Sequence, residues 1–318
     1  MTDMQYRRLG NSGLSVSVVG VGCNNFGGRI DDDRATEVVH AALDAGITLF
    51  DTADSYGIQA GASEEILGKA LGSHRDDVIV ATKFGVDTRG ANGPDWSARG
   101  SRRYIAKAVE ASLRRLGTDY IDLYQLHTPD PSTPIEETIS ALDDLVRAGK
   151  VRYLGHSNFS GWQVADAAWI ARELRATPFI SAQNRYSLLD RQVEKDLVPA
   201  CERFGLGILP FFPLQNGLLT GKYRRGEAAP QGTRLGTERY ARVLVQAPWD
   251  TVESLERFAQ ERGRSLLDLA IGGLAAKPAV ASVIAGATRA EQVHANASAG
   301  TWQPTAGDMS ALDAILAS

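Results

Sequence analysis

The chain alternates short apolar runs with longer stretches in which apolar residues recur at helical spacing. The clearest stripe consists of Ile105, Val109, Leu113 and Leu116, and Ser101 stands before it at the position of a capping residue. This spacing puts the apolar side chains on one face, which predicts an amphipathic helix. The same pattern predicts further helices over residues 33–45, 63–72, 162–173, 193–204 and 266–276.

Eight apolar runs of strand type alternate with the predicted helices. Parallel strands need long crossovers that are usually helical, so this alternation indicates a parallel sheet. Eight such units of uniform composition predict an α/β fold, a single (β/α)8 TIM-barrel domain over residues 1–318. The strands are expected near residues 18–22, 47–50, 78–81, 121–126, 151–155, 179–183, 207–211 and 282–285.

Three further local patterns refine this outline. Residues 5–8 and 15–19 flank a Gly/Asn-rich turn, which predicts a β-hairpin ahead of the barrel. Thr133 to Glu136 combine a capping box with proline at the first helical position, so another helix is expected there. Two long polar segments, 85–100 and 215–242, follow strands, and loops of this length are usually functional or mobile. We expect both on the C-terminal face of the barrel.

Polar residues follow four of the predicted strands, and after the strand near 151–155 they are His156, Ser157 and Asn158. Asp51 ends one strand and Tyr56 lies in its loop, while Lys83 and His127 follow the next two strands. A barrel builds its active site from such strand ends. Each residue alone could be an ordinary loop residue, but the combination is much less expected by chance.

The motifs around these residues resemble those of the aldo-keto reductase superfamily. They are DTADSYG at 51–57, ATKFG at 81–85, LYQLHTPDP at 123–131 and GHSNFS at 155–160, in the order of the family. The resemblance runs from Tyr6 to Asn296. It implies a hairpin that closes the bottom of the barrel, NADPH/NADP+ as cofactor and a small-molecule carbonyl compound as substrate.

The four residues suit carbonyl reduction, which needs a hydride donor and a proton donor. A free tyrosine has a pKa near 10, and a nearby ammonium lowers it. We expect Lys83 to do this for Tyr56, and Asp51 to keep Lys83 in place and charged. His127 would hydrogen-bond the substrate oxygen. These roles match those that the resemblance implies.

The resemblance also implies cofactor contacts. Ser157, Asn158 and Gln183 would hold the carboxamide, and Phe211 would lie against the nicotinamide. The helix start after Gly286 would face a phosphate. The full expected set is Gly22, Cys23, Asn24, Asp51, Ser157, Asn158, Gln183, Phe211, Phe212, Pro213, Leu214, Gly217, Lys222, Arg234, Gly286, Thr288, Arg289, Gln292 and Asn296.

Some residues depart from the family pattern or have other readings. Phe212 replaces a usual serine, Ala285 a common proline and Ala295 a frequent acid. Gly20 and Gly22 do not form a Rossmann fingerprint, because the third glycine is missing. We further expect His156 to be a hydrogen-bonded core histidine, and Asn24, Asn25, Phe26, Trp96 and Trp302 to be candidate pocket walls.

Composition and charge limit the classes of partner and the cellular environment that we expect for the protein. The net charge is −4, from 34 basic and 38 acidic residues, so nothing favours nucleic acid or an anionic membrane. Two distant cysteines, Cys23 and Cys201, indicate neither a disulfide framework nor a metal site, and they suit a cytoplasmic protein. The start lacks a signal-peptide pattern, and no apolar run approaches the ~20 residues of a membrane span. A homo-oligomer is compatible with all of this.

Parts of the sequence are also compatible with two other functions. The FGGRI and HTPDP stretches are similar to those of potassium channel β subunits, which would suggest a nicotinamide-sensing regulatory subunit. Those proteins lack the histidine that His127 matches, which favours catalysis. An isomerase or aldolase would use Lys83 as a Schiff-base nucleophile, but Asp51 nearby would keep Lys83 protonated.

Overall fold

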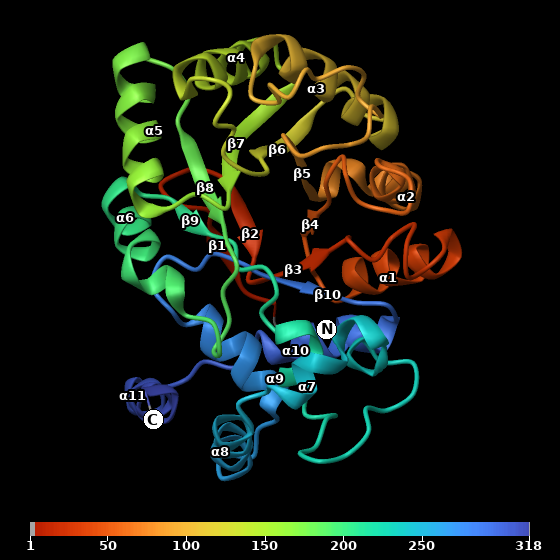
Figure 1. Cartoon of the computed structure of the whole chain (residues 1–318), viewed down its shortest axis with the longest axis vertical. Helices are drawn as coiled ribbons and strands as arrows, with labels where there is room; N and C mark the ends of the chain where they lie inside the picture. Colours follow the sequence, from red (N-terminus) through yellow and green to blue (C-terminus); the bar gives the residue numbers. More distant parts are fainter. Residues whose placement is uncertain (1–3, 318) are drawn as a thin grey trace.

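The computed structural model describes residues 4–317, and its centre is a ring of eight parallel strands (Figure 1). Their order in the sheet is β10-β3-β4-β5-β6-β7-β8-β9. Backbone hydrogen bonds of Ile208 with Ala279 and Ala281, and of Pro210 with Ile284, join the two ends of this sheet. The predicted (β/α)8 barrel is therefore confirmed. The strands are β3 (Val19–Gly22), β4 (Leu49–Asp51), β5 (Ile79–Phe84), β6 (Ile121–Leu126), β7 (Val151–Ser157), β8 (Phe179–Gln183), β9 (Gly207–Ile208) and β10 (Val283–Gly286).

The predicted hairpin, β1 (Tyr6–Arg8) and β2 (Ser15–Ser17), closes the N-terminal end of the barrel. Leu9 and Val16 pack there with barrel residues such as Leu123 and Leu209. Gly10 has a positive φ of 58°, and a Cβ built on it would lie 2.5 Å from the carbonyl oxygen of Gly205. Only glycine permits this close approach, and the closed bottom leaves the C-terminal end for a site.

Helices cover the outside of the ring, as Figure 1 shows for α1 to α6. The helix that was expected behind Ser101 is confirmed, and the Ser101 hydroxyl accepts a hydrogen bond from the amide of Tyr104. The capping box at Thr133 is wrong. Pro134 is the capping residue, and the Thr133 hydroxyl instead donates to Asp130 at 2.8 Å. The helices of this layer are α1 (Asp32–Asp44), α2 (Ala62–Leu71), α3 (Arg102–Leu116), α4 (Ile135–Arg147), α5 (Gly161–Leu174), α6 (Leu197–Phe204) and α10 (Ala290–Ala299).

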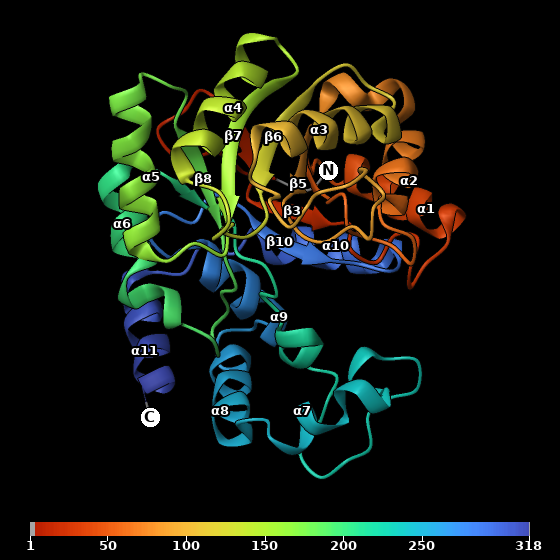
Figure 2. The same cartoon turned by 45° about the horizontal axis from the view of Figure 1, so that its top comes forward.

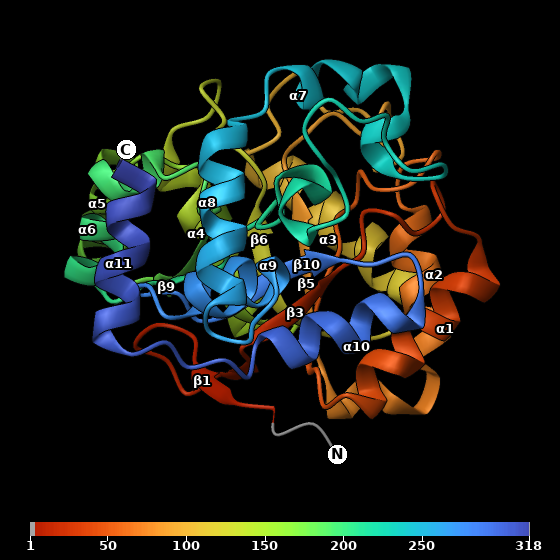
Figure 3. The same cartoon turned by 90° about the horizontal axis from the view of Figure 1, so that it is seen from below.

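A second apolar cluster lies beside the barrel, where the chain between β9 and β10 and the C-terminal helix add further helices (Figure 2). It contains Leu219, Leu235, Leu255 and Leu269, and it also buries Trp302. Figure 3 shows α8 and α11 side by side within it. Because Leu219 and Leu235 belong to it, the cluster anchors the long segment 215–242 that follows β9. Its helices are α7 (Ala241–Val245), α8 (Trp249–Gln260), α9 (Leu266–Asp268) and α11 (Ala306–Ala317).

Several boundaries differ from the sequence expectations. The strand expected over 207–211 ends at Ile208, although Phe211 still bridges to Arg185. The helix expected over 266–276 changes after α9 into a π-helical turn, Leu269–Gly273. Within residues 4–317 no helix has the length and apolar character needed to cross a membrane.

Candidate active site

Lys83 lies at the centre of the site, with a fully buried side chain on β5. Its ammonium donates to Asp51 Oδ2 at 2.6 Å, to the carbonyl oxygen of Thr52 at 2.8 Å and to the Tyr56 hydroxyl at 3.3 Å. A lysine ammonium has three protons, so these acceptors use all of them. The three expected neighbours Asp51, Tyr56 and Lys83 are thus brought together.

Burial and the neighbouring charges together set the pKa values of Lys83 and Tyr56. Burial lowers the pKa of Lys83, but the charge of Asp51 and the bonds to its partners more than reverse this, so the net pKa is raised. Burial raises the pKa of Tyr56 more than the charge of Lys83 lowers it. Lys83 thus lowers the pKa of Tyr56 as expected, but it offsets only part of the desolvation. Tyr56 holds its proton at neutral pH.

The second oxygen of Asp51 is held by two amides. Gln183 donates to Asp51 Oδ1 at 2.7 Å and Gln125 does so at 3.2 Å. Gln125 was not predicted, although it was visible as a lone amide in an apolar strand, in register with Lys83 on β5. These bonds fix the carboxylate from the far side of the barrel.

His127 follows β6 and faces Tyr56, with ring centroids 5.9 Å apart and planes at 79°. Its backbone amide donates to the carbonyl oxygen of Phe84, and Asn158 donates to its carbonyl oxygen at 2.9 Å. Burial, and then the charge of Lys83, lower the pKa of His127 to about 3. The imidazole is therefore neutral at physiological pH and has one N–H to donate.

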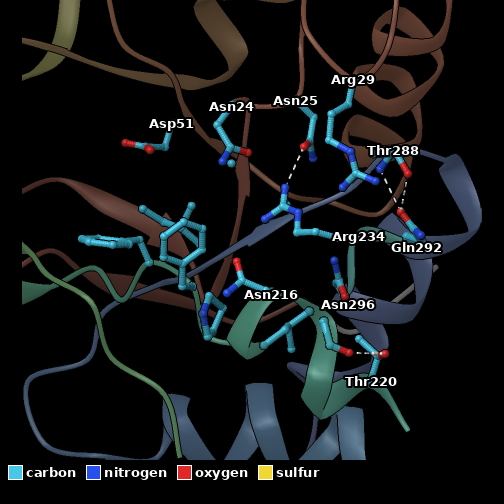
Figure 4. A pocket seen from close by; sticks show the side chains of 18 of the residues that line it. Asn24, Asn25, Arg29, Asp51, Asn216, Thr220, Arg234, Thr288, Gln292 and Asn296 are labelled. Carbon is cyan, nitrogen blue, oxygen red and sulfur yellow. Dashed lines mark hydrogen bonds between the residues drawn. The ribbon is translucent and has the colours of Figure 1, made fainter. Parts of the chain in front are cut away.

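A cavity of about 660 Å³ begins at Asp51, Tyr56 and His127 and extends to the start of α10. Figure 4 shows Asp51 on one side of it and Thr288 and Gln292 on the other. Lys83 lies behind Tyr56 and does not line it, and Cys23 is buried away from it. The other expected cofactor residues all line this cavity: Gly22, Asn24, Asp51, Ser157, Asn158, Gln183, Phe211, Phe212, Pro213, Leu214, Gly217, Lys222, Arg234, Gly286, Thr288, Arg289, Gln292 and Asn296.

The far end of the cavity is cationic. Arg29, Lys222, Arg234 and Arg289 line it, whereas Asp51 is the one carboxylate among its described lining residues. Arg234 donates to Asn25 Oδ1 at 3.0 Å and so connects the segment after β9 to the loop after β3 (Figure 4). Of the cations, Arg29, Lys222 and Arg289 form no ion pair with any residue between 4 and 317.

Sequence reasoning missed a part of this wall. Arg29 could have been found from the sequence, because a basic residue there follows two glycines in a loop that begins at a strand end. Asn25 was expected as a pocket wall and does line the cavity. The other lining residues outside the predicted cofactor set, apart from Tyr56 and His127, are Arg29, Asn216, Thr220, Gln231, Gly232, Thr233, Leu267, Ile284 and Ala295.

The predicted residue Gln292 on α10 already has partners within the protein. Its Oε1 accepts hydrogen bonds from the amide and the hydroxyl of Thr288, at 2.8 and 3.1 Å.

Four other expectations fail in the structure. Phe26 is fully buried, Trp96 is 61% exposed and Trp302 lies in the second apolar cluster, so none of the three lines the cavity. His156 is buried as expected and stacks on Phe159. However, neither of its ring nitrogens has a hydrogen-bond partner in residues 4–317, and burial lowers its pKa to about 3. Apolar packing, not a hydrogen bond, keeps this imidazole neutral.

Comparisons with known proteins agree with this geometry. A sequence model of the Aldo/keto reductase family matches residues 18–317. The chain is 37% identical to L-glyceraldehyde 3-phosphate reductase of Escherichia coli strain K12, over 93% of this chain and 88% of the relative. It is 38% identical to a probable voltage-gated potassium channel subunit beta of rice, over 92% and 90%. It is 35% identical to versiconal hemiacetal acetate reductase of Aspergillus parasiticus, over 84% of each. A family match over nearly the whole chain, on a barrel with this arrangement of residues, shows that the protein belongs to the aldo/keto reductase family.

Proposed function

We propose that this protein is an NADPH-dependent oxidoreductase that reduces aldehyde or ketone groups of small molecules to alcohols. The observation that carries the proposal is the single cavity that joins Tyr56 and His127 at one end to four cationic side chains at the other. A ligand that fits it has a small reactive group at one end and several negative charges at the other.

The residues present fit a nicotinamide dinucleotide phosphate. Ser157, Asn158 and Gln183 offer amide and hydroxyl groups near the tetrad, which consists of Asp51, Tyr56, Lys83 and His127. The Phe211 ring also lines this cavity. Arg29, Lys222, Arg234 and Arg289 offer positive charge for phosphates at the other end. When bound, the cofactor supplies the hydride that no side chain can supply.

The side chains of the tetrad then have separate tasks. Tyr56 donates its proton to the carbonyl oxygen, and Lys83, 3.3 Å from the hydroxyl, stabilises the phenolate that is left. Asp51 keeps Lys83 charged. The neutral His127 donates an N–H to the same oxygen and stabilises the charge that develops there.

Two alternatives have less support. Lys83 is an ammonium with three acceptors, so it offers no free amine for a Schiff base. A nicotinamide-sensing regulatory subunit is the other alternative, motivated by the name of the rice relative. The presence of His127 opposite Tyr56 favours turnover instead.

The test is an NADPH-oxidation screen over aldehydes, ketones and sugars, with Tyr56→Phe as the matched background. Turnover that depends on Tyr56 supports the reductase. Tight NADPH binding without turnover of any compound would favour the nicotinamide-sensing regulatory subunit instead.

A further inference from the structure

Asp54 is a fully buried carboxyl group to which the proposed reaction gives no task. Its backbone amide donates to the carbonyl oxygen of Lys83 at 3.1 Å, and it stands two residues before Tyr56. Its Oδ2 accepts from the carboxamide of Asn92 at 2.7 Å. Asn92 is 6% exposed and belongs to the long loop 85–100. Asp54 therefore touches three parts of the C-terminal face: the Tyr56 loop, the end of β5 and the loop that follows β5.

The Asp54–Asn92 contact leaves two oxygens without a donor. Asp54 Oδ1 and Asn92 Oδ1 are both buried, and neither has a hydrogen-bond partner in the described part of the chain. Unpaired buried polar atoms are costly and rare. An ionised carboxylate can only accept, but a carboxylic acid has one proton to donate. A proton on Asp54 Oδ1 would satisfy both oxygens at once, by donation to Asn92 Oδ1.

We propose that Asp54 is a positioning residue that carries a proton on Oδ1 and pairs with the carboxamide of Asn92 through two hydrogen bonds. The pair joins the Tyr56 loop to residues 85–100. Its effect on turnover rests on the proposed reductase function, whereas the pair itself does not.

The charges around Asp54 favour the neutral acid. Glu64 on α2 is also buried, and Arg115 on α3 forms an ion pair with it at 2.6 Å. One guanidinium compensates one carboxylate, so a second charge here would lack a partner. Lys83 is committed to Asp51. Burial first, and Glu64 next, hold the pKa of Asp54 well above its usual range, although Asn92, Arg115 and Lys83 act the other way.

Two phenols complete the surroundings, and neither adds a charge. Tyr104 on α3 accepts from Asn92 at 3.2 Å, and burial raises its pKa. Tyr124 on β6 is fully buried with its pKa raised well above the usual value, for the same reason. No group facing Asp54 in residues 4–317 therefore supplies a second uncommitted positive charge.

The pair also anchors the loop. Thr88 and Asn92 are buried, and both hydrogen-bond Tyr104, while Arg89 between them is exposed. Release of Asn92 should therefore free the peptide bond after Arg89 for trypsin. It should also loosen the Tyr56 loop, because Asp54 stands two residues before Tyr56 and its side chain would lose the contact with Asn92.

The decisive variants are Asp54→Asn and Asp54→Leu. An asparagine can form the same two hydrogen bonds with Asn92 and has no proton to lose, whereas leucine has a similar size and forms none. We expect D54N to be cleaved after Arg89 at the parent rate and to keep turnover within about threefold. We expect D54L to be cleaved at least tenfold faster and to lose at least about tenfold in kcat, since small displacements of catalytic groups are costly. Asn92→Leu breaks the pair from the loop side, and it replaces D54L if that variant does not fold.

The pH dependence tests the proton itself. A carboxyl whose folded pKa is raised contributes its stability below the unfolded pKa of about 4, and this is lost as the pH rises towards the folded pKa. D54N has no such loss, so its Tm should exceed that of the parent by more at pH 8 than at pH 5. Asp87→Asn, an exposed change in the same loop, should give a constant difference.

Two results would overturn the proposal: cleavage of D54N as fast as that of D54L, or a D54N Tm difference that does not change with pH. Both readouts use no substrate or cofactor. Retention of turnover by Tyr56→Phe would refute the proposed reductase mechanism and leave these two results to decide on Asp54.

Discussion

The two ends of the cavity satisfy their charges in different ways. At the tetrad, Lys83 is fully buried and its three protons have protein acceptors. At the other end, Arg29 and Arg289 are exposed and form no ion pair within residues 4–317. One end is organised before any ligand arrives, and the other offers charge that a ligand can compensate.

This difference indicates which substitutions should affect turnover and which should affect cofactor binding. Preorganised groups in a site shielded from water act on charge that develops during the reaction. Exposed cations mainly contribute to affinity, and an exposed ion pair is worth only about 1 kcal/mol or less. Substitutions at the tetrad should therefore lower turnover, and substitutions at the cationic end should alter cofactor affinity.

The largest effect is expected for Tyr56→Phe. Loss of the proton donor should lower carbonyl reduction by about 10²–10⁴-fold, the range typical of general acid catalysis. NADPH affinity, measured by fluorescence titration, should stay nearly unchanged because the ring remains. Turnover equal to that of the parent would refute the assignment of Tyr56 as the proton donor.

His127→Ala should follow, with a loss of about 10²–10³-fold in kcat for the missing donor to the carbonyl oxygen. The fold, monitored by circular dichroism, should not change. His74→Ala is the matched control, because this exposed histidine pairs with Asp77 on the surface. If the kcat of His127→Ala equalled that of the parent on several substrates, His127 would not be the donor to the carbonyl oxygen.

The cationic end should give a smaller effect that is confined to NADPH. We expect the parent to prefer NADPH over NADH by about a hundredfold, from two or three charge-assisted contacts with the 2′-phosphate. Arg289→Ala, Arg234→Ala and Arg29→Ala should each reduce this ratio, by about tenfold for the residue that touches the phosphate.

The control for these substitutions is Arg34→Ala, an exposed arginine on α1 that is paired with Glu37. Equal affinity of the parent for both cofactors would refute the preference. A ratio that survives all three substitutions would place the phosphate elsewhere.

The smallest effect concerns pH. Since burial lowers the pKa of His127 to about 3, this histidine stays neutral from pH 5 to 8. Its protonation should therefore add no inflection to kcat/KM near pH 6.5, the ordinary value for histidine. A pH–rate profile over this range checks the point, and an inflection near 6.5 that disappears in His127→Gln would contradict it.

The sequence alone was enough to predict the barrel and to predict that Asp51, Tyr56, Lys83 and His127 lie close together. Strands and crossover helices carry different apolar periodicities, so their alternation can be read locally. Asp51, Lys83 and His127 could be assigned because the C-terminal ends of parallel strands meet at one face whatever the details of packing. The resemblance supplied most of the cavity lining for a similar reason, since those residues also lie at or just after strand ends.

Only the tertiary structure decided how the charges balance. The net direction of the Tyr56 pKa depends on whether burial or Lys83 dominates, and burial is not visible in a motif. Gln125, Arg29 and Asn92 reach the site from separate segments, so no local pattern showed that they contact Asp51, the cavity and Asp54. Hydrogen bonds and desolvation depend on atomic distances between segments far apart in the chain, and those distances exist only once the barrel has closed.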